Sequence, residues 1–433
     1  MSALDTIYAL ASGAGKAGVA VIRISGPGCR HVIDVLTPLK KIKPRYAYLT
    51  TLQFQEKKLD QAVVLFFEGP ASFTGEDVLE LHVHGGTGVL TSIFEALAKI
   101  SGCRPAQAGE FSRRAVLNGK MDLTQAEGIM DLVNAETEAG RKQALRQVSG
   151  ELKELLDSWR AQLVRIGGFL EAFIDFPEED IPSEKEQMIE EKLGTLQTAI
   201  LDYLDDHQGA QRLHDGFKIV LCGHTNVGKS SLLNTLMKRE MALVSSIPGT
   251  TRDVVEGHLD IDGFPVILSD TAGLRASGGV LERRGIDRAK KEIQDADLVL
   301  HLVEAKTYPK VEDLPVKADL MLTVWTKADL PNTVPADALK ISTKTGEGVR
   351  ALLHQISQIL KRHYGTQSLL TRQRYRVALT DCAAALGRAL KNNVLELKAE
   401  DIRLASKAIG RITGQIETEE LLDVIFKEFC IGK

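Results

Sequence analysis

The segment Gly223–Ser230 constrains this chain more than any other feature of its sequence. Its residues, GHTNVGKS, fit the pattern G-x-x-x-x-G-K-[ST] and lie between a predicted strand (218–222) and a predicted helix (231–237). In that context the backbone N–H groups of the loop turn inward around phosphate oxygens, and the helix N-terminus adds its dipole. Lys229 is then expected to reach the β- and γ-phosphates, and Ser230 to ligate Mg²⁺. The sequence predicts a nucleoside-triphosphate site.

Two later motifs indicate the rest of this site and its base. Asp270–Gly273 follows the predicted strand 265–269, where an acidic residue can serve the magnesium side and Gly273 can sense the γ-phosphate. Thr326–Asp329 follows the predicted strand 320–325. A carboxylate at Asp329 can accept both N1–H and the 2-amino group of guanine, which adenine cannot offer. The base is therefore expected to be guanine.

One residue departs from the usual guanine motif. GTPases usually carry Asn where this chain has Thr326, and a hydroxyl replaces only some of the contacts of an amide. The residues expected to contact GTP are Asn226, Val227, Gly228, Lys229, Ser230, Ser231, Ser245, Ser246, Ile247, Pro248, Gly249, Thr250, Thr251, Asp270, Thr271, Ala272, Gly273, Thr326, Lys327, Ala328, Asp329, Ser342, Thr343 and Lys344.

Hydrophobic periodicity divides the chain into segments of different fold class. Residues 1–118 alternate β-branched runs with glycine turns, which predicts an N-terminal α+β domain. Residues 213–362 alternate strands and helices, which predicts a parallel sheet with helices on both faces, the Ras-like P-loop or G domain. Residues 119–212 and 363–433 are helical, so we expect one helical bundle domain in two parts, with the G domain inserted between them.

The helical segments are expected from residues spaced three or four apart. One apolar stripe runs from Leu145 to Leu163, which predicts one or two long helices without a proline before Pro177. The tail has a similar stripe, which Thr413 and Gly414 interrupt. Thr418 can cap a last helix, whose apolar face would be Leu422, Ile425, Phe426 and Phe429.

Composition excludes several classes of protein. The chain has 433 residues and a net charge of −4, and no apolar run approaches the roughly 20 residues of a membrane-spanning helix. Its five cysteines are scattered and form no C-x-x-C pair, which argues against a disulfide framework or a structural zinc site. The start shows no signal peptide. These features favour a cytoplasmic protein in which a nucleic-acid partner would bind a local patch.

Three segments resemble one family when they are taken together. Phe73–Asp77 (FTGED), Gly249–Asp253 (GTTRD) and the terminal Cys430–Lys433 (CIGK) resemble the MnmE (TrmE) family of bacterial tRNA-modification GTPases, and the resemblance spans nearly the whole chain. It implies a folate-binding N-terminal domain, dimerisation through that domain, and a flavin-dependent partner protein, with which a heterotetramer is expected.

The same resemblance implies an activity. The family adds an aminomethyl or carboxymethylaminomethyl group at C5 of the wobble uridine of certain tRNAs. The carbon comes from a tetrahydrofolate derivative, such as 5-formyl- or 5,10-methylene-tetrahydrofolate. The G domains dimerise in the triphosphate state, and K⁺ promotes this step.

Roles for single residues follow from the resemblance. Leu274 stands where Ras-like enzymes use a glutamine, so the family's distant glutamate, here Glu282, is expected to orient the attacking water. Without the resemblance, Glu282 reads as an exposed helix residue. The residues implied for K⁺ are Asn226 and the backbone of Ser245, Ile247 and Thr250, and those for Mg²⁺ are Ser230 and Thr251.

The resemblance also places folate at four positions: Arg23, Glu80, Lys120 and Lys433. A carboxylate suits the amide and amine edge of a pterin, and basic groups suit the glutamyl tail or the ring carbonyl. His82 and His84 share one side of a strand, but no third metal ligand is apparent nearby, so His84 is expected to shape the pocket. Cys430 is expected to be a packed or pocket-lining residue.

A second function uses the same G domain. A GTP-switched module that binds RNA or the assembling ribosome needs the nucleotide motifs but no folate pocket. Folate binding separates this alternative from the modification enzyme.

Overall fold

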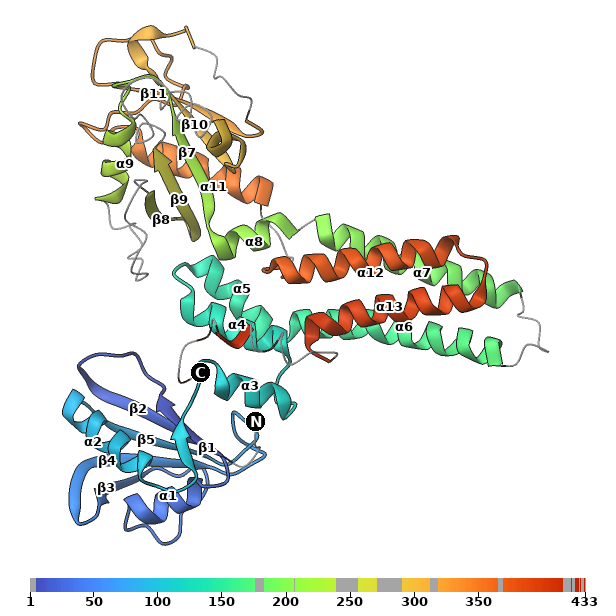
Figure 1. The fold of residues 1–433 in the computed structure, drawn as a ribbon. Coiled ribbons are helices and arrows are strands. Elements are labelled where there is room, and N and C mark those ends of the chain that lie inside the picture. Colours follow the sequence, from blue (N-terminus) through green and yellow to red (C-terminus); the bar gives the residue numbers. More distant parts are fainter. Residues whose placement is uncertain are drawn as a thin grey trace, which may run out of the picture. The chain divides into compact units, whose positions relative to one another are not determined.

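The structure is a computed structural model, and it describes residues 5–175, 183–205, 207–238, 256–270, 290–311, 318–364 and 369–415, with a few positions between 422 and 432. Two compact units divide the chain: Met1–Met130 with Gly410–Lys433, and Asp131–Ile409. Figure 1 colours the described residues from blue at the N-terminus to red at the C-terminus. The sequence predicts a finer division, into residues 1–118, 119–212, 213–362 and 363–433, and these limits stay a prediction.

The first unit is built on a six-stranded sheet in the order β3-β4-β5-β2-β1-β6. Its neighbours pair antiparallel, except for β1 and β6, which run parallel. The strands are β1 (Thr6–Leu10), β2 (Ala17–Ser25), β3 (Tyr48–Phe54), β4 (Lys57–Phe67), β5 (Val78–Gly85) and β6 (Cys103–Pro105). The sequence of this region predicts strands at residues 18–26, 61–67 and 77–84, and these correspond to β2, part of β4 and β5.

One face of this sheet carries the core of the unit. Ile22 and Ile24 of β2 are fully buried and belong to one cluster with residues of helices α1 (Cys29–Leu36) and α2 (Thr87–Ala98). Side chains alternate along a strand, so Arg23 of β2 and Glu80 of β5 lie on the opposite face. The two candidate folate residues therefore share the face opposite this main core, where Ile7 and Ala9 of β1 belong to a smaller apolar cluster.

The C-terminal residues pack within the first unit. Helices α3 (Glu110–Leu117) and α4 (Leu123–Asn134) follow the sheet. Leu123 and Ala126 of α4 form an apolar cluster with the C-terminal side chains. The apolar face predicted for the last helix is confirmed, because Leu422, Ile425, Phe426 and Phe429 are buried. Thr418, the expected cap, lies outside the described residues.

One part of the second unit is helical, and its helices come from before and after the second sheet in the sequence. They are α5 (Glu138–Val148), α6 (Glu151–Asp175), α7 (Ser183–Asp205), α8 (His207–Asp215), α12 (Gln373–Lys391) and α13 (Leu395–Thr413). Helices α6, α7, α12 and α13 lie side by side as a bundle (Figure 1). The Trp159 ring meets that of Tyr203 edge-on at 5.7 Å, and Gln197 donates a 3.0 Å hydrogen bond to the Ala383 carbonyl oxygen. Among the described residues, no helix is long and apolar enough to span a membrane.

The apolar stripe expected from Leu145 to Leu163 is wrong at its start. The chain turns at Gly150, which has a φ of 94°, and this turn separates α5 from α6. The helical phase is therefore reset between the two helices. Leu145 is 40% exposed, whereas the fully buried Gln147 donates a 3.1 Å hydrogen bond to the hydroxyl of Tyr375.

The second unit also contains a five-stranded sheet in the order β11-β10-β7-β9-β8. The strands are β7 (Phe217–Cys222), β8 (Glu256–Ile261), β9 (Phe264–Asp270), β10 (Leu298–Glu304) and β11 (Met321–Thr326). Ile219 and Leu221 pack with helices α9 (Lys229–Met237) and α11 (Val349–Tyr364), and Val220 packs on the other side with Ile293. The predicted sheet with both faces covered is confirmed.

Strand β8 was not predicted, and it alone runs antiparallel to its neighbour. It joins β9 through a turn at Asp262 and Gly263, whose φ values are 51° and 90°. An Asp-Gly pair favours a two-residue hairpin turn, because both residues must adopt positive φ. That dipeptide was the sequence signal for this hairpin.

Candidate functional site

The phosphate loop connects β7 to α9 and depends on its first glycine. Gly223 has a φ of 143°, and a Cβ there would lie 2.3 Å from the carbonyl oxygen of Leu302 on β10. Another residue would therefore force the loop away from the sheet. Gly228 caps helix α9 with a φ of 106°, and Asn226 also adopts a positive φ, of 63°. The backbone has the tight conformation that the motif predicts.

Lys229 lies over this loop. Its ammonium group donates hydrogen bonds to the carbonyl oxygens of Gly223 (2.7 Å) and His224 (2.8 Å), and the residue is only 7% exposed. These contacts hold the positive charge against the backbone of the loop. A charge held in a poorly hydrated position interacts more strongly with a phosphate than one on the open surface does.

Ser230 and Asp270 meet although they are 40 residues apart. The Ser230 hydroxyl donates a 2.7 Å hydrogen bond to Oδ2 of Asp270, which is 5% exposed at the end of β9. The structure thus brings together the two oxygen groups predicted for the magnesium side. Oxygen ligands of this kind suit Mg²⁺, which binds through few protein groups and keeps several waters.

Thr326 ends β11 and reaches the phosphate loop. Its hydroxyl lies 2.7 Å from the carbonyl oxygen of Val227 and 3.2 Å from that of Val303. Thr326 is 3% exposed. Although it replaces the usual asparagine, this residue ties the base motif directly to the phosphate motif.

Asp329 is held by Ser342, which belongs to the segment 342–344 that is also predicted to contact GTP. The Ser342 hydroxyl donates a 2.8 Å hydrogen bond to Asp329, and the Ala328 N–H donates to the Ile341 carbonyl oxygen. The hydrogen bond from Ser342 lowers the pKa of Asp329, and the charge of Lys344 acts in the same direction. Lys327 pairs with Glu304. Asp329 is therefore presented as a carboxylate.

Much of the predicted site lies outside the described residues. The residues that lie outside include the segment predicted to bind K⁺, one of the two residues predicted to ligate Mg²⁺, and the three residues after Asp270. They also include the glutamate predicted to orient the attacking water and two C-terminal residues. These residues are Ser245, Ser246, Ile247, Pro248, Gly249, Thr250, Thr251, Thr271, Ala272, Gly273, Glu282, Cys430 and Lys433.

Two of the folate candidates form an ion pair on the first sheet. Arg23 and Glu80 stand opposite each other in the β2–β5 register, and their charged groups are 3.0 Å apart. The other Glu80 oxygen lies 3.3 Å from Nε2 of His82, and the Arg23 guanidinium lies over the Phe73 ring at 5.2 Å. A carboxylate has about four lone-pair sites, so Glu80 can still accept from a ligand.

Lys120 contacts the loop between β4 and β5, the loop that contains Phe73. Its ammonium group donates a 2.9 Å hydrogen bond to the carbonyl oxygen of Pro70. Gly432 lies against β1, because a Cβ there would fall 2.1 Å from the Leu10 carbonyl oxygen, and its φ is 102°. The residue before Lys433 is therefore fixed on the first unit.

His84 pairs with an aspartate that the sequence did not single out. Its Nδ1 and its backbone N–H both lie 2.8 Å from the Asp60 carboxylate. Partial burial acts to raise the pKa of Asp60, but these hydrogen bonds outweigh it and lower the pKa. Among the described residues, no group of three or more His, Cys, Asp or Glu side chains could hold a metal ion.

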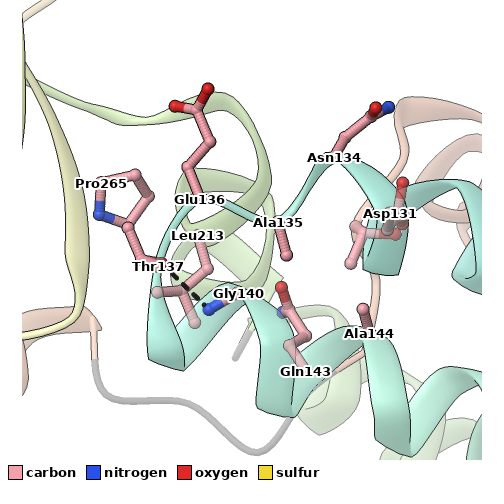
Figure 2. Close-up of a pocket in the computed structure, with 11 residues that line it drawn as sticks. Asp131, Asn134, Ala135, Glu136, Thr137, Gly140, Gln143, Ala144, Leu213 and Pro265 are labelled. Carbon is pink, nitrogen blue, oxygen red and sulfur yellow. Dashed lines mark hydrogen bonds between the residues drawn. The ribbon is translucent and has the colours of Figure 1, made fainter. Parts of the chain in front are cut away.

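A cavity of about 190 Å³ lies elsewhere in the second unit (Figure 2). Its walls come from the end of α4, from α5 and the segment between these helices, from Leu213 of α8, from Pro265 near the start of β9 and from Thr371. Thr137 caps α5 there by accepting a 3.2 Å hydrogen bond from the Gly140 N–H. The wall contains none of the residues predicted to bind GTP or folate, so the cavity is separate from both sites.

The fold and this site together define a multidomain P-loop GTPase with an α+β N-terminal domain and a helical domain. Family descriptions agree with this class. The N-terminus of the GTP-binding protein TrmE matches residues 6–120, and the MnmE helical domain matches residues 123–430.

Curated relatives extend the match to the whole chain. The tRNA modification GTPase MnmE of Parvibaculum lavamentivorans is 46% identical, and 99% of this chain aligns with 100% of that protein. The protein of the same name from Paramagnetospirillum magneticum is also 46% identical, with the same coverage. The G domain of the T. maritima FeoB iron transporter, a solved structure, is 23% identical over 33% of this chain and 98% of that chain, at a TM-score of 0.23, a likeness too weak to place any residue. The chain belongs to the MnmE family of tRNA modification GTPases.

Proposed function

We propose that this chain hydrolyses GTP in the service of tRNA modification, the role that the names of its relatives state. The observation that supports the nucleotide part best is the meeting of three motifs at one end of the second sheet. The loop after β7 carries Lys229, Asp270 at the end of β9 accepts a hydrogen bond from Ser230, and Thr326 of β11 ties the base motif to the loop.

The described side chains divide the binding of GTP among them. Lys229 neutralises the β- and γ-phosphates, and the loop N–H groups hold their oxygens. Asp329, held by Ser342, accepts from N1–H and the 2-amino group of guanine. Adenine would leave this carboxylate without a donor. The arrangement therefore selects guanine.

The metal ions of the proposal use groups of the same site. Ser230 and Asp270 provide oxygen atoms that fit Mg²⁺, with Thr251 completing the shell, and the ion would neutralise charge on the phosphates. Asn226 and the backbone of Ser245, Ile247 and Thr250 are proposed for K⁺. A cation there supplies the positive charge that an arginine finger gives to other GTPases.

Water activation is assigned to Glu282. The position after the D-x-x-G motif is Leu274, which cannot bond to water. A carboxylate can orient the attacking water by accepting one of its hydrogens. Glu282 is therefore proposed as the catalytic residue of hydrolysis.

Folate is proposed to bind on the first unit. The pair Arg23–Glu80 and Lys120 both contact the loop that contains Pro70 and Phe73, which supports one shared pocket. Lys433 would join them, because Gly432 is packed on β1. The group bound there is a tetrahydrofolate derivative, which supplies the one-carbon unit for C5 of the wobble uridine.

The proposal includes two protein partners. A second copy of the chain would bind through the N-terminal segment, and the sheet face opposite the core supports this because Val19 and Leu49 on it are 59% and 69% exposed. A flavin-dependent protein completes the modification enzyme. The proposed location is the cytoplasm, and the proposed domains are residues 1–118, 119–212 with 363–433, and 213–362.

The test is the wobble nucleoside of tRNA from a strain that lacks the gene. Liquid chromatography with mass spectrometry should show loss of the C5-modified uridine, recovery with the wild-type gene, and no recovery with Lys229→Ala. Unchanged wobble nucleosides together with a ribosome-assembly defect would contradict the proposal and favour a GTP-switched binding module.

A further inference from the structure

A charge network underlies the loop between β4 and β5 in the first unit. Glu76 of this loop receives two contacts from Nη1 of Arg114, at 3.0 and 3.2 Å, and the Ser25 hydroxyl donates to it at 2.7 Å. The side chains of Arg114 and Glu76 are only 12% and 21% exposed. An ion pair so shielded from water holds its geometry better than one on the open surface does.

Arg114 is itself fixed from behind. Its Nη1 donates to the Asp5 carbonyl oxygen at 2.9 Å, and its Nη2 pairs with Glu110 at 3.1 Å. Glu110 also binds Arg104 at 2.6 Å, and Arg104 reaches the Asp5 carboxylate at 3.3 Å. The guanidinium of Arg114 therefore has little freedom to move when the loop is displaced.

The loop above this network contacts residues proposed for folate from two sides. Phe73 lies under the Arg23 guanidinium, and the Pro70 carbonyl oxygen accepts from Lys120. Lys120 follows helix α3, which carries Arg114, and Asn118 of the same segment donates a 2.7 Å hydrogen bond to the Thr74 carbonyl oxygen. Arg114 thus joins the segment that carries Lys120 to the loop that contacts Arg23.

We infer that Arg114 and Glu76 are positioning residues of the folate site, an inference that rests on the proposed folate function. The pair fixes the loop, and through it the spacing between the Arg23–Glu80 pair and Lys120. A pterin with its glutamyl tail is a long ligand that needs a carboxylate at one end and cations at a set separation. Neither Arg114 nor Glu76 needs to touch the ligand for this effect.

The test measures binding of 5-formyltetrahydrofolate to the full chain by isothermal titration calorimetry. Glu76→Gln and Arg114→Gln should each weaken binding by about 10-fold or more, by analogy with the loss of residues that orient the ligands of a metal site. The double variant should be little worse than Arg114→Gln alone, because the Arg114–Glu76 ion pair is already lost in that single variant. Arg114→Lys, which keeps the charge, should recover part of the affinity.

Two control variants separate a positioning effect on folate binding from a general loss of protein stability. Arg30→Gln breaks contacts with Glu68 at the start of the same loop and with Asp77 at its end (3.5 Å). The Arg30 and Glu68 side chains are 53% and 54% exposed, so the affinity should stay within about twofold. Val32→Ala opens a cavity in the α1 core and lowers the melting temperature without touching the loop. Its affinity should also be unchanged, although its stability is reduced.

The outcomes distinguish this inference from the proposed function. If Arg23→Ala abolishes binding while Glu76→Gln and Arg114→Gln keep wild-type affinity, the positioning role is wrong and the folate site stands. If Arg23→Ala binds normally, the folate site itself is wrong, and the inference fails with it. Equal weakening in Val32→Ala would show that binding follows stability alone, which also overturns it.

Discussion

The hydroxyl of Thr326 donates a hydrogen bond of 2.7 Å to the carbonyl oxygen of Val227. Both residues are almost fully buried, at 3% and 2% exposed. The end of β11, which leads to the base motif, is thereby joined to the loop that leads to the phosphates. The distance between the base and the phosphate contacts is set by this bond, even though threonine replaces the usual asparagine.

Thr326→Val tests that connection. The substitution keeps the shape but leaves the Val227 carbonyl oxygen without this donor, which costs about 1–3 kcal/mol when the acceptor is buried. We expect lower stability in urea denaturation and weaker binding of a fluorescent GDP analogue. Thr307→Val is the control, because the Thr307 hydroxyl donates to the backbone carbonyl oxygen of Glu304 at an exposed position. Equal effects in both variants would contradict the role given to Thr326.

Asp329→Asn tests how the base is recognised. An amide NH₂ would face the N1–H and 2-amino donors of guanine, so GTP affinity should fall by about 100-fold or more. Xanthine has a carbonyl oxygen at C2, which the amide can donate to. Competition binding should therefore show that the variant prefers xanthosine triphosphate. An unchanged preference for GTP would remove Asp329 from base recognition.

Gly432→Ala tests the C-terminal contact with β1. The added Cβ would meet the Leu10 carbonyl oxygen at 2.1 Å, and the φ of 102° disfavours alanine. We expect displacement of Lys433 and weaker binding of 5-formyltetrahydrofolate. Gly18→Ala is a matched control in the same unit, because nothing lies within 4 Å of its Cβ position. Full folate affinity in Gly432→Ala would show that Lys433 does not take part.

The ionisation of Glu110 should make the free energy of unfolding depend on pH. Burial acts to raise the pKa of Glu110, but hydrogen bonds from Arg104 and from the Gln107 N–H outweigh it and lower the pKa. A lowered folded-state pKa stabilises the protein above the unfolded value, about 4.3, and this contribution is lost as the pH falls. Glu110→Gln should therefore be less stable than the wild type at pH 7, with a difference that shrinks below about pH 4. A difference that is constant over this range would contradict the assignment.

The sequence predicted the parts of this protein that depend on local patterns. Gly223–Ser230 has a fixed spacing and needs a strand before it and a helix after it, so one segment was sufficient to place the phosphate loop. The strands of the second sheet other than β8 followed from apolar runs. By contrast, Gly150 resets the helical phase between α5 and α6. The prediction placed Leu145 and the residues up to Leu163 on one continuous helical face, so it could not show this reset.

The rest of the candidate site depends on pairs that are far apart in the sequence. Arg114 meets Glu76 across 38 residues, and His84 meets Asp60 across 24. Neither pair forms a motif, because each depends on which strands and helices become neighbours after folding. The signal in the sequence was only that Glu76 lies within FTGED.

The central claim is tested most directly by GTP hydrolysis of the purified full chain in KCl and in NaCl at equal ionic strength. Equal ionic strength separates specific cation binding from screening, and Lys229→Ala provides the blank. We predict a large rate increase in KCl only, with Glu282→Ala inactive in both salts but still able to bind GTP. Equal, slow rates in the two salts would contradict the assignment of Asn226 to K⁺ and the potassium-dependent mechanism.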